Sequence, residues 1–349
     1  MMLTKKKFII NFGCFILLSL LMSCITQINY DVSNEKTRIV INSLITSKFE
    51  TQKVYVGRSV LTGTNSITNS VPIQNATVRI MSSIEDFEFV HDKDGTYTAS
   101  FAGVIGETYV MEVVVDGQTY RSTSQTMPNA LPLPVPDTEL INIQSLNSAG
   151  NLINDKFVNI NLTGTITDDF KALYRINGEY EFMEFNPPST TLKTCYVTES
   201  IDNNTIKLLS AKDLRTNNIQ KFNLLDIPFD ARFLRLYAFK IAQYHLSDES
   251  LSYWNKVNLI SNTGMNIFDA PPGKILGNIK NVNDPNDEVL GNFTLGGVRD
   301  TIIFTNMVKL GGVVTDICQV RFNSSRPEVC INCLLLPFST TIKPDYWPL

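Results

Sequence analysis

The stretch DGTYTASFAGVIGETYVMEVVVDG, residues 94–117, decides how the first half of the chain folds. It begins and ends with Asp-Gly, a dipeptide that adopts the positive φ angles required by tight turns between antiparallel strands. Between these turns lie Thr96–Ala99 and Tyr109–Val115, which are rich in β-branched and aromatic residues and therefore favour strands. The stretch predicts β-hairpins.

Similar short runs, separated by turn residues, lie on both sides of this stretch. They are Arg38–Ile45, Lys53–Val60, Ala76–Met81, Phe87–His91 and Thr119–Ser124. No apolar period typical of a helix persists between Arg38 and Met127, so the pattern favours strands throughout. We expect an immunoglobulin-like β-sandwich over residues 38–127.

Four prolines among residues 128–136 mark the end of this predicted domain. Proline fixes φ and lacks a backbone N–H, so the segment can form neither a helix nor a central strand. We expect a semi-rigid linker there, followed by a second β-rich domain at residues 137–349. Its candidate strands are Phe157–Ile166, Ala172–Ile176, Glu179–Phe185, Phe233–Tyr244, Thr301–Phe304 and Asp316–Phe322.

One prominent helix is expected in this second domain, from Asp248 to about Ile260. Ser247 can cap its first turn, while Asp248 and Glu249 place negative charge at the positive end of the helix dipole. Gly264 lies close enough to help end it. The expected fold class is therefore mainly β: a sandwich, then a β-rich domain that carries one helix.

The N-terminus has the layout of an export signal. The lysines Lys5–Lys7 precede an apolar run that ends in the tetrapeptide Leu21-Met22-Ser23-Cys24. This tetrapeptide resembles the lipobox of bacterial lipoproteins, whose cysteine is acylated and becomes the mature N-terminus. We interpret residues 1–23 as a lipoprotein signal peptide, Cys24 as the lipid attachment site and residues 24–37 as a tether. The alternatives are an ordinary cleaved signal or an uncleaved anchor helix.

Composition limits the class of partner. Of the 349 residues, 43% are hydrophobic and 18% are charged, as in packed globular proteins. Removal of the three lysines of the signal would change the formal net charge from −4 to −7. Because no run of Lys or Arg forms a basic patch, nucleic acid is not expected as a partner.

Four further cysteines, Cys195, Cys318, Cys330 and Cys333, follow the predicted signal. An oxidising compartment favours structural disulfides, for which three connectivities are possible. The Cys-x-x-Cys pair could instead be a redox pair or half of a metal site. A redox pair needs a helix start after a strand, whereas Pro337 soon follows here, and zinc would need a second closely spaced pair. We therefore interpret all four as structural disulfide cysteines.

No catalytic residue or cofactor is expected. Only His91 and His245 offer imidazole bases. We interpret His91 as a solvated turn residue and His245 as a capping or packing residue. The sequence lacks the His-Glu-x-x-His, Gly-x-Ser-x-Gly and phosphate-loop patterns that would supply enzyme chemistry.

Two groups of residues carry alternative interpretations. Asp284, Asp287 and Glu288 could hold calcium, but their spacing lacks the glycine and distal glutamate of an EF-hand loop, and such sequences commonly form turns. Trp254 and Trp347 could stack on sugars, although strand-rich cores use the same residues. We expect no metal site, and we expect core packing for these aromatic residues.

Ten short motifs are distributed over most of the chain that follows the predicted signal. They are Ile39–Ile45, Val71–Val78, Gly106–Tyr109, Tyr174–Ile176, Tyr253-Trp254, Pro271–Gly273, Gly277–Ile279, Leu290–Phe293, Arg326–Cys333 and Pro344–Trp347. Their order and spacing resemble the Bacteroidota lipoprotein family catalogued as domain of unknown function 4249. The last two motifs are similar to its closing Cys-x-x-Cys and Pro-x-aromatic-Trp signature.

The resemblance implies a place in the cell more than a reaction, because the family has no assigned activity. Its members look like outer-membrane lipoproteins, often encoded beside TonB-dependent receptors. This implies a lipid-anchored, non-catalytic accessory or ligand-capture partner of such a receptor, on either face of the outer membrane. The alternatives are a glycan- or protein-binding surface module that acts without a receptor, and a hydrolase assembled from scattered residues.

The lipobox interpretation makes a direct prediction. Mass spectrometry of the protein from native membranes is expected to find a mature N-terminus at Cys24 that carries fatty acyl chains, which together hold a protein at a bilayer almost permanently. An unlipidated mature N-terminus, or polypeptide free in the supernatant, would contradict it.

Overall fold

The computed structural model describes residues 36–60, 70–146, 150–185, 192–201, 206–262, 275–319 and 326–348. The chain divides into two compact units, of which one holds residues 1–37 and 60–67 and the other holds residues 38–59 and 68–349. Every strand and helix described below belongs to the second unit. Cys24 and Gly264 lie outside the described residues.

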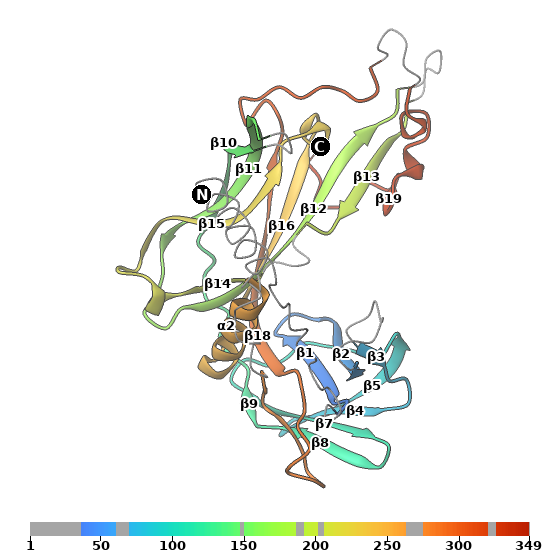
Figure 1. Cartoon of the computed structure of the whole chain (residues 1–349), viewed down its shortest axis with the longest axis vertical. Coiled ribbons are helices and arrows are strands. Elements are labelled where there is room, and N and C mark those ends of the chain that lie inside the picture. The colour runs from blue at the N-terminus through green and yellow to red at the C-terminus, as the bar shows by residue number, and fades with distance from the viewer. Residues whose placement is uncertain are drawn as a thin grey trace, which may run out of the picture. The chain divides into compact units, whose positions relative to one another are not determined.

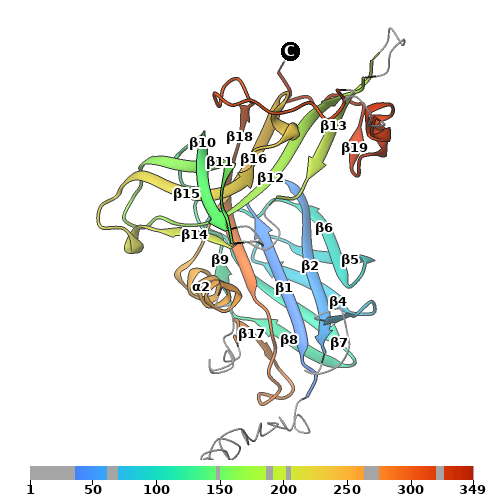
Figure 2. The same ribbon diagram turned by 45° about the horizontal axis from the view of Figure 1, so that its top comes forward.

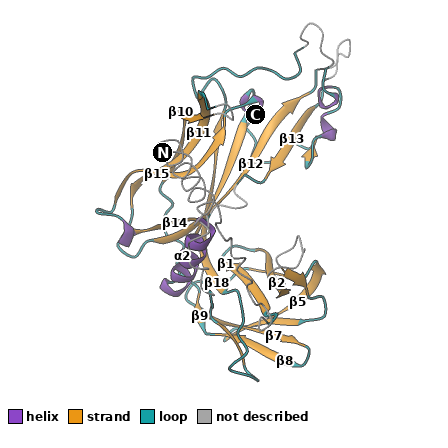
Figure 3. Cartoon of the chain, in the orientation of Figure 1, coloured by secondary structure: helices purple, strands orange, loops and turns teal. Residues whose placement is uncertain are grey.

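Strands make up most of the described chain, as the orange ribbons of Figure 3 show. In chain order the earlier ones are β1 (Ile39–Thr46), β2 (Glu50–Ser59), β3 (Ser70–Pro72), β4 (Thr77–Ser82), β5 (Asp86–Lys93), β6 (Thr96–Phe101), β7 (Thr108–Val115), β8 (Gln118–Ser122), β9 (Gln125–Thr126) and β10 (Val135–Leu146). The later elements are β11 (Leu152–Thr165), β12 (Lys171–Met183), β13 (Thr194–Glu199), β14 (Lys207–Ser210), β15 (Asn218–Pro228), β16 (Tyr237–His245), helix α2 (Asp248–Asn262), β17 (Ile279–Asn281), β18 (Phe293–Thr305) and β19 (Ser339–Thr340). Short 3₁₀ helices are η1 (Ala211–Asp213), η2 (Ala231–Phe233), η3 (Glu328–Cys330) and η4 (Cys333–Leu335).

Both Asp-Gly pairs form the predicted hairpin turns. Asp94 and Gly95 have φ angles of 48° and 72°, and Asp116 and Gly117 have 51° and 76°. Each pair lies between two strands, β5 and β6 in the first case and β7 and β8 in the second. Two positive φ angles in succession match the turn whose twist suits a hairpin.

The strands form two hydrogen-bonded sheets. The larger follows the order β17-β8-β7-β4-β5-β6-β2-β1-β18-β16-β12-β13-β19, with β3, β9 and β14 attached beside it. The smaller has the order β10-β11-β15. Figure 1 shows β1–β9 and β10–β16 as two groups of strands joined through β18. The mainly β fold class with a sandwich-like arrangement is confirmed.

Each group of strands surrounds its own buried core. The first core contains residues of β1, β2 and β4–β8, including Ile41, Val54 and Met111, none of which is more than 1% exposed. The second contains residues of β11, β12 and β14–β16, including Ile160 and Tyr174, which are fully buried. Apolar side chains at alternate strand positions supply both cores, as the period of a half-buried strand requires.

Strand β18 connects the two groups. It pairs in parallel with β1, placing Ser43 opposite Phe293, and antiparallel with β16, and Figure 2 shows β18 beside β1. Phe293 and Leu295 belong to the first core although they lie far along the chain. The boundaries that we predicted at residues 128–136 stay a prediction. Strands from both sides of this segment, such as β1 and β18, belong to one hydrogen-bonded sheet.

The proline-rich segment is held against the second core. The side-chain amide of Gln243, fully buried, donates to the Leu131 carbonyl at 3.0 Å, and Leu131 and Leu133 pack on the core. Pro136 lies in β10, which has a partner on one side only. An edge strand is where a proline is tolerated in a sheet.

The predicted helix is confirmed as α2. The Ser250 amide donates to the Ser247 hydroxyl at 3.2 Å, and the Asp248 carboxylate accepts from Lys171 and Lys212, both at 3.0 Å. Salt bridges to both lysines lower the pKa of Asp248, so its charge is retained at the positive end of the helix. No described helix is both long and apolar enough to cross a membrane.

The candidate strand at Asp316–Phe322 is wrong in its described part. Asp316 is irregular, and Ile317 and Cys318 form a turn. The Asp316 carboxylate accepts the Cys318 amide at 2.8 Å, a local bond that competes with strand pairing. Strands β13 and β15 were not among our candidates.

Two motif glycines allow three segments to meet where β18 begins. Gly291 has a φ of 97°, and a Cβ there would lie 2.0 Å from the Ile41 carbonyl oxygen. A Cβ on Gly277 would lie 1.9 Å from the Gly291 carbonyl oxygen. These are approaches that only glycine permits.

This close approach predicts the effect of substituting Gly291. Gly117 also has a positive φ, but a Cβ there would meet nothing within 4 Å, so Gly117→Ala is expected to lower the free energy of unfolding by about 1 kcal/mol through backbone strain alone. Gly291→Ala should lower the free energy of unfolding by about 1–3 kcal/mol more than Gly117→Ala does, because the methyl group forces β1 and β18 apart. Equal losses in urea unfolding of the two variants would contradict this.

Candidate functional site

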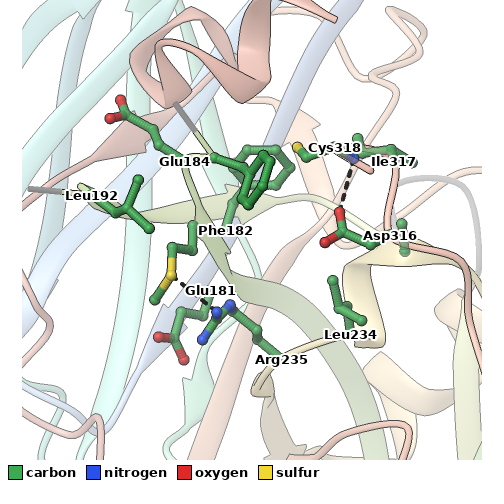
Figure 4. Close-up of a pocket in the computed structure, with 12 residues that line it drawn as sticks. Glu181, Phe182, Glu184, Leu192, Leu234, Arg235, Asp316, Ile317 and Cys318 are labelled. Atoms are coloured by element: carbon green, nitrogen blue, oxygen red, sulfur yellow. Dashed lines mark hydrogen bonds between the residues drawn. The ribbon is translucent and has the colours of Figure 1, made fainter. Parts of the chain in front are cut away.

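A cavity of about 370 Å³ lies where the end of β12 meets the turns before β13 and β16. Its apolar walls come from Phe182, Met183, Phe185, Leu192, Leu234 and Ile317. Figure 4 shows side chains from these separate segments around one space. The volume falls in the range of small-molecule sites.

Two of the four charged side chains of this pocket serve the fold. The buried Glu184 carboxylate accepts the backbone N–H of Cys333 at 3.1 Å and of Lys193 at 3.4 Å. The Asp316 carboxylate accepts the Cys318 amide. Their charges are therefore engaged by the turns that form the pocket wall.

The other two, Glu181 and Arg235, have no ion-pair partner among the described residues. Both are half-buried. The Arg235 guanidinium donates to the Met183 sulfur at 3.0 Å, the contact marked by the dashed line at Arg235 in Figure 4. A thioether is a weak acceptor, so the guanidinium retains most of its capacity to bind an anion.

The four cysteines that we singled out form two disulfides, and one of them, Cys318, lines this pocket. The structure pairs Cys195 with Cys333 and Cys318 with Cys330, with Cα separations of 5.9 and 5.4 Å. The two cysteines of the Cys-x-x-Cys motif thus have different partners, and all four are buried. This arrangement fixes η3 and η4 to β13 and to the turn at Cys318.

The closing motif folds back onto the large sheet. The buried Glu179 carboxylate accepts from Lys240 and from the Tyr346 hydroxyl. Burial, together with the hydrogen bond to Glu179, raises the pKa of Tyr346. Trp347 packs edge-on against Tyr196 with ring centroids 5.1 Å apart, so its predicted role in packing is confirmed.

The segment that begins at the disulfide-bonded Cys330 and continues past Cys333 presents apolar side chains to solvent. We call this the cap surface; it consists of Ile331, Leu334, Leu335, Phe338 and Ile342, which are 48–85% exposed. They lie in the red segment beside β13 in Figure 1. Phe338 is the most exposed, at 85%, and its φ is +57°. A bulky side chain in this left-handed region is uncommon and strained.

The two histidines lie apart, in β5 and β16. His91 is a strand residue opposite Tyr97, and its ring packs edge-on against the tyrosine, so the interpretation as a solvated turn residue is wrong. The turn consists of Asp94 and Gly95, so β5 still pairs with β6 at His91. His245 is buried, with its Nε2 3.2 Å from the Asp169 carbonyl, and packing remains its role.

The acids considered for calcium face protein donors instead. Asp287 accepts from Asn281 at 2.8 Å, and Glu288 pairs with Arg38 at 2.9 Å. Burial and the nearby Asp287 raise the pKa of Tyr120 to about 12. In the described part of the chain, no three His, Cys, Asp or Glu side chains are grouped to hold a metal ion.

The pocket predicts different roles for two glutamates on one segment. Glu184→Ala should lower the free energy of unfolding by about 1–3 kcal/mol, because it leaves the buried Cys333 amide without an acceptor. Glu181→Ala, three residues away, breaks no ion pair with a described residue and should change it by less than about 0.5 kcal/mol. Urea unfolding of the full chain measures both values, and equal effects would refute the structural role of Glu184.

Comparisons with known proteins agree with the sequence resemblance. The comparison with curated proteins found no match. The model of one family, described as domain of unknown function (DUF4249), matches residues 25–302, which is more than half of the chain. The chain therefore belongs to the DUF4249 family.

Proposed function

We propose that this chain is a lipoprotein of the outer membrane, anchored through lipid on Cys24, that acts as a non-catalytic accessory or ligand-capture partner of a TonB-dependent receptor. The lipobox at residues 21–24 supports the anchor. Two disulfides support a location outside the cytoplasm, because such bonds persist in oxidising compartments.

The observation that carries the proposed partnership is the cap surface. Exposed apolar side chains are common singly, but several along one short segment mark a contact site for another protein. Two disulfides bond Cys330 and Cys333, at the start of this segment, to Cys318 and to Cys195 of β13. A rigid apolar surface loses little entropy on docking, which favours a lasting contact.

Phe338 is the natural centre of this contact. Its left-handed backbone costs about 1–2 kcal/mol relative to an ordinary conformation, and at 85% exposure its ring receives little packing in return. Aromatic residues at the centre of an interface often supply a large share of the binding energy.

A second candidate function is a surface module that binds its ligand without a receptor. The pocket at the end of β12 favours it, because a binding module needs such a cavity and a purely structural partner does not. The two functions differ in one observable: whether detergent extracts the chain from the membrane in complex with a receptor or without one.

The partnership is tested by gentle detergent extraction and crosslinking of the full-length protein from native outer membranes. The native protein should co-purify with a TonB-dependent receptor, and Phe338→Asn should reduce the recovered receptor about tenfold. Asn tolerates the left-handed region, so the variant is expected to fold at least as stably as the native chain.

Phe49→Asn is the matched control, because Phe49 is 74% exposed and lies outside the cap surface. It should leave receptor recovery unchanged. A native protein that is extracted as a lone monomer would overturn the partnership, and equal recovery with both variants would overturn the role of the cap surface.

A further inference from the structure

We propose that the pocket at the end of β12 binds a short apolar peptide or amino acid in its zwitterionic form. Glu181 would pair with the ligand's ammonium group and Arg235 with its carboxylate. The inference deepens the proposed capture role by naming a ligand class, and it rests on that role only for its biological meaning.

The charges of the pocket lead to this class. Glu184 and Asp316 each accept a backbone N–H of the pocket wall. Among the described residues, the Glu181 carboxylate accepts no hydrogen bond, the Arg235 guanidinium donates to the Met183 sulfur, and neither group has an ion-pair partner. One is negative and one is positive. A ligand that carried a single charge would leave the other half-buried group desolvated without compensation, which is unfavourable.

The walls define the rest of the ligand. Leu234 and Ile317 lie on one side of Figure 4 and Leu192 on the other, with Phe182 between them. These aliphatic and aromatic groups suit an apolar side chain, because burying one contributes free energy in proportion to the area removed from water. The cavity of about 370 Å³ is comparable in size to a short peptide.

The position of Arg235 also fits a carboxylate. A planar guanidinium binds a carboxylate through two parallel hydrogen bonds, whereas here the guanidinium contacts the Met183 sulfur. A ligand carboxylate would replace this weak contact with a charge-assisted one.

The test uses the full-length lipidated chain in detergent micelles and the dipeptide leucyl-leucine as the probe, with binding measured by isothermal titration calorimetry. Two blocked forms of the probe remove one charge each: N-acetyl-leucyl-leucine lacks the ammonium and leucyl-leucinamide lacks the carboxylate. Each blocked form should bind the native chain about tenfold more weakly than the free dipeptide, since each loses one charge-assisted contact.

Variants assign each charge to its residue. Glu181→Gln should bind the N-acetylated and the free dipeptide equally, while it still distinguishes the amide. Arg235→Met should show the reverse pattern. Glu85→Gln and Lys256→Met, at exposed positions away from the pocket, should retain the native preference for the free dipeptide. This crossed pattern separates a binding role from a merely structural one.

Three outcomes would overturn the inference: no heat of binding with leucyl-leucine at millimolar concentration, equal binding of all three probes by the native chain, or the same loss of selectivity in the control variants. None of them bears on receptor co-purification. A chain that co-purifies with a receptor but does not bind the dipeptide would refute the ligand class without contradicting the proposed partnership.

Discussion

The parallel pairing of β1 with β18 is the constraint on which the rest of the structure depends. Backbone hydrogen bonds join Ile41 to Leu290 and Leu290 to Ile39, both at 2.9 Å. At the first residue of β18, the Asn278 side chain bonds both the N–H and the carbonyl of Phe293 at 2.8 Å, as a neighbouring strand would. Buried backbone groups must be paired, and this side-chain amide satisfies two of them.

A structural feature could be predicted from the sequence when residues close together in the chain determine it. A few adjacent residues determine the Asp-Gly hairpins and the cap of α2, and both were predicted. The pairing of β1 with β18 joins residues 250 apart, Ser43 and Phe293, and no local pattern announces it. The wrong strand at Asp316 failed for a local reason, a side-chain bond to the Cys318 amide that apolar spacing does not reveal.

The candidate site was harder to predict than the fold. The cysteines were visible as a group, but their pairing depends on the register that places Cys195 near η4. Nothing in the sequence singled out Glu181 or Arg235, because a lone acid or base is most often solvated. Unlike Glu184 and Asp316, they accept no backbone N–H and have no ion-pair partner among the described residues, although they line a cavity, and only the folded chain shows this.

The pocket and the cap surface share one support, and this limits how either can be altered. Cys318 lines the pocket and is bonded to Cys330 at the end of η3, while Glu184 of the pocket holds the amide of Cys333 at the start of η4. Loss of either link would loosen both surfaces, so a cysteine or Glu184 variant cannot separate the proposed ligand binding from the proposed partner docking. Phe338 and Arg235 variants can, because neither residue forms one of these links. The pocket and the cap surface therefore depend on the same disulfide-linked segment, but different side chains make the proposed contacts of each.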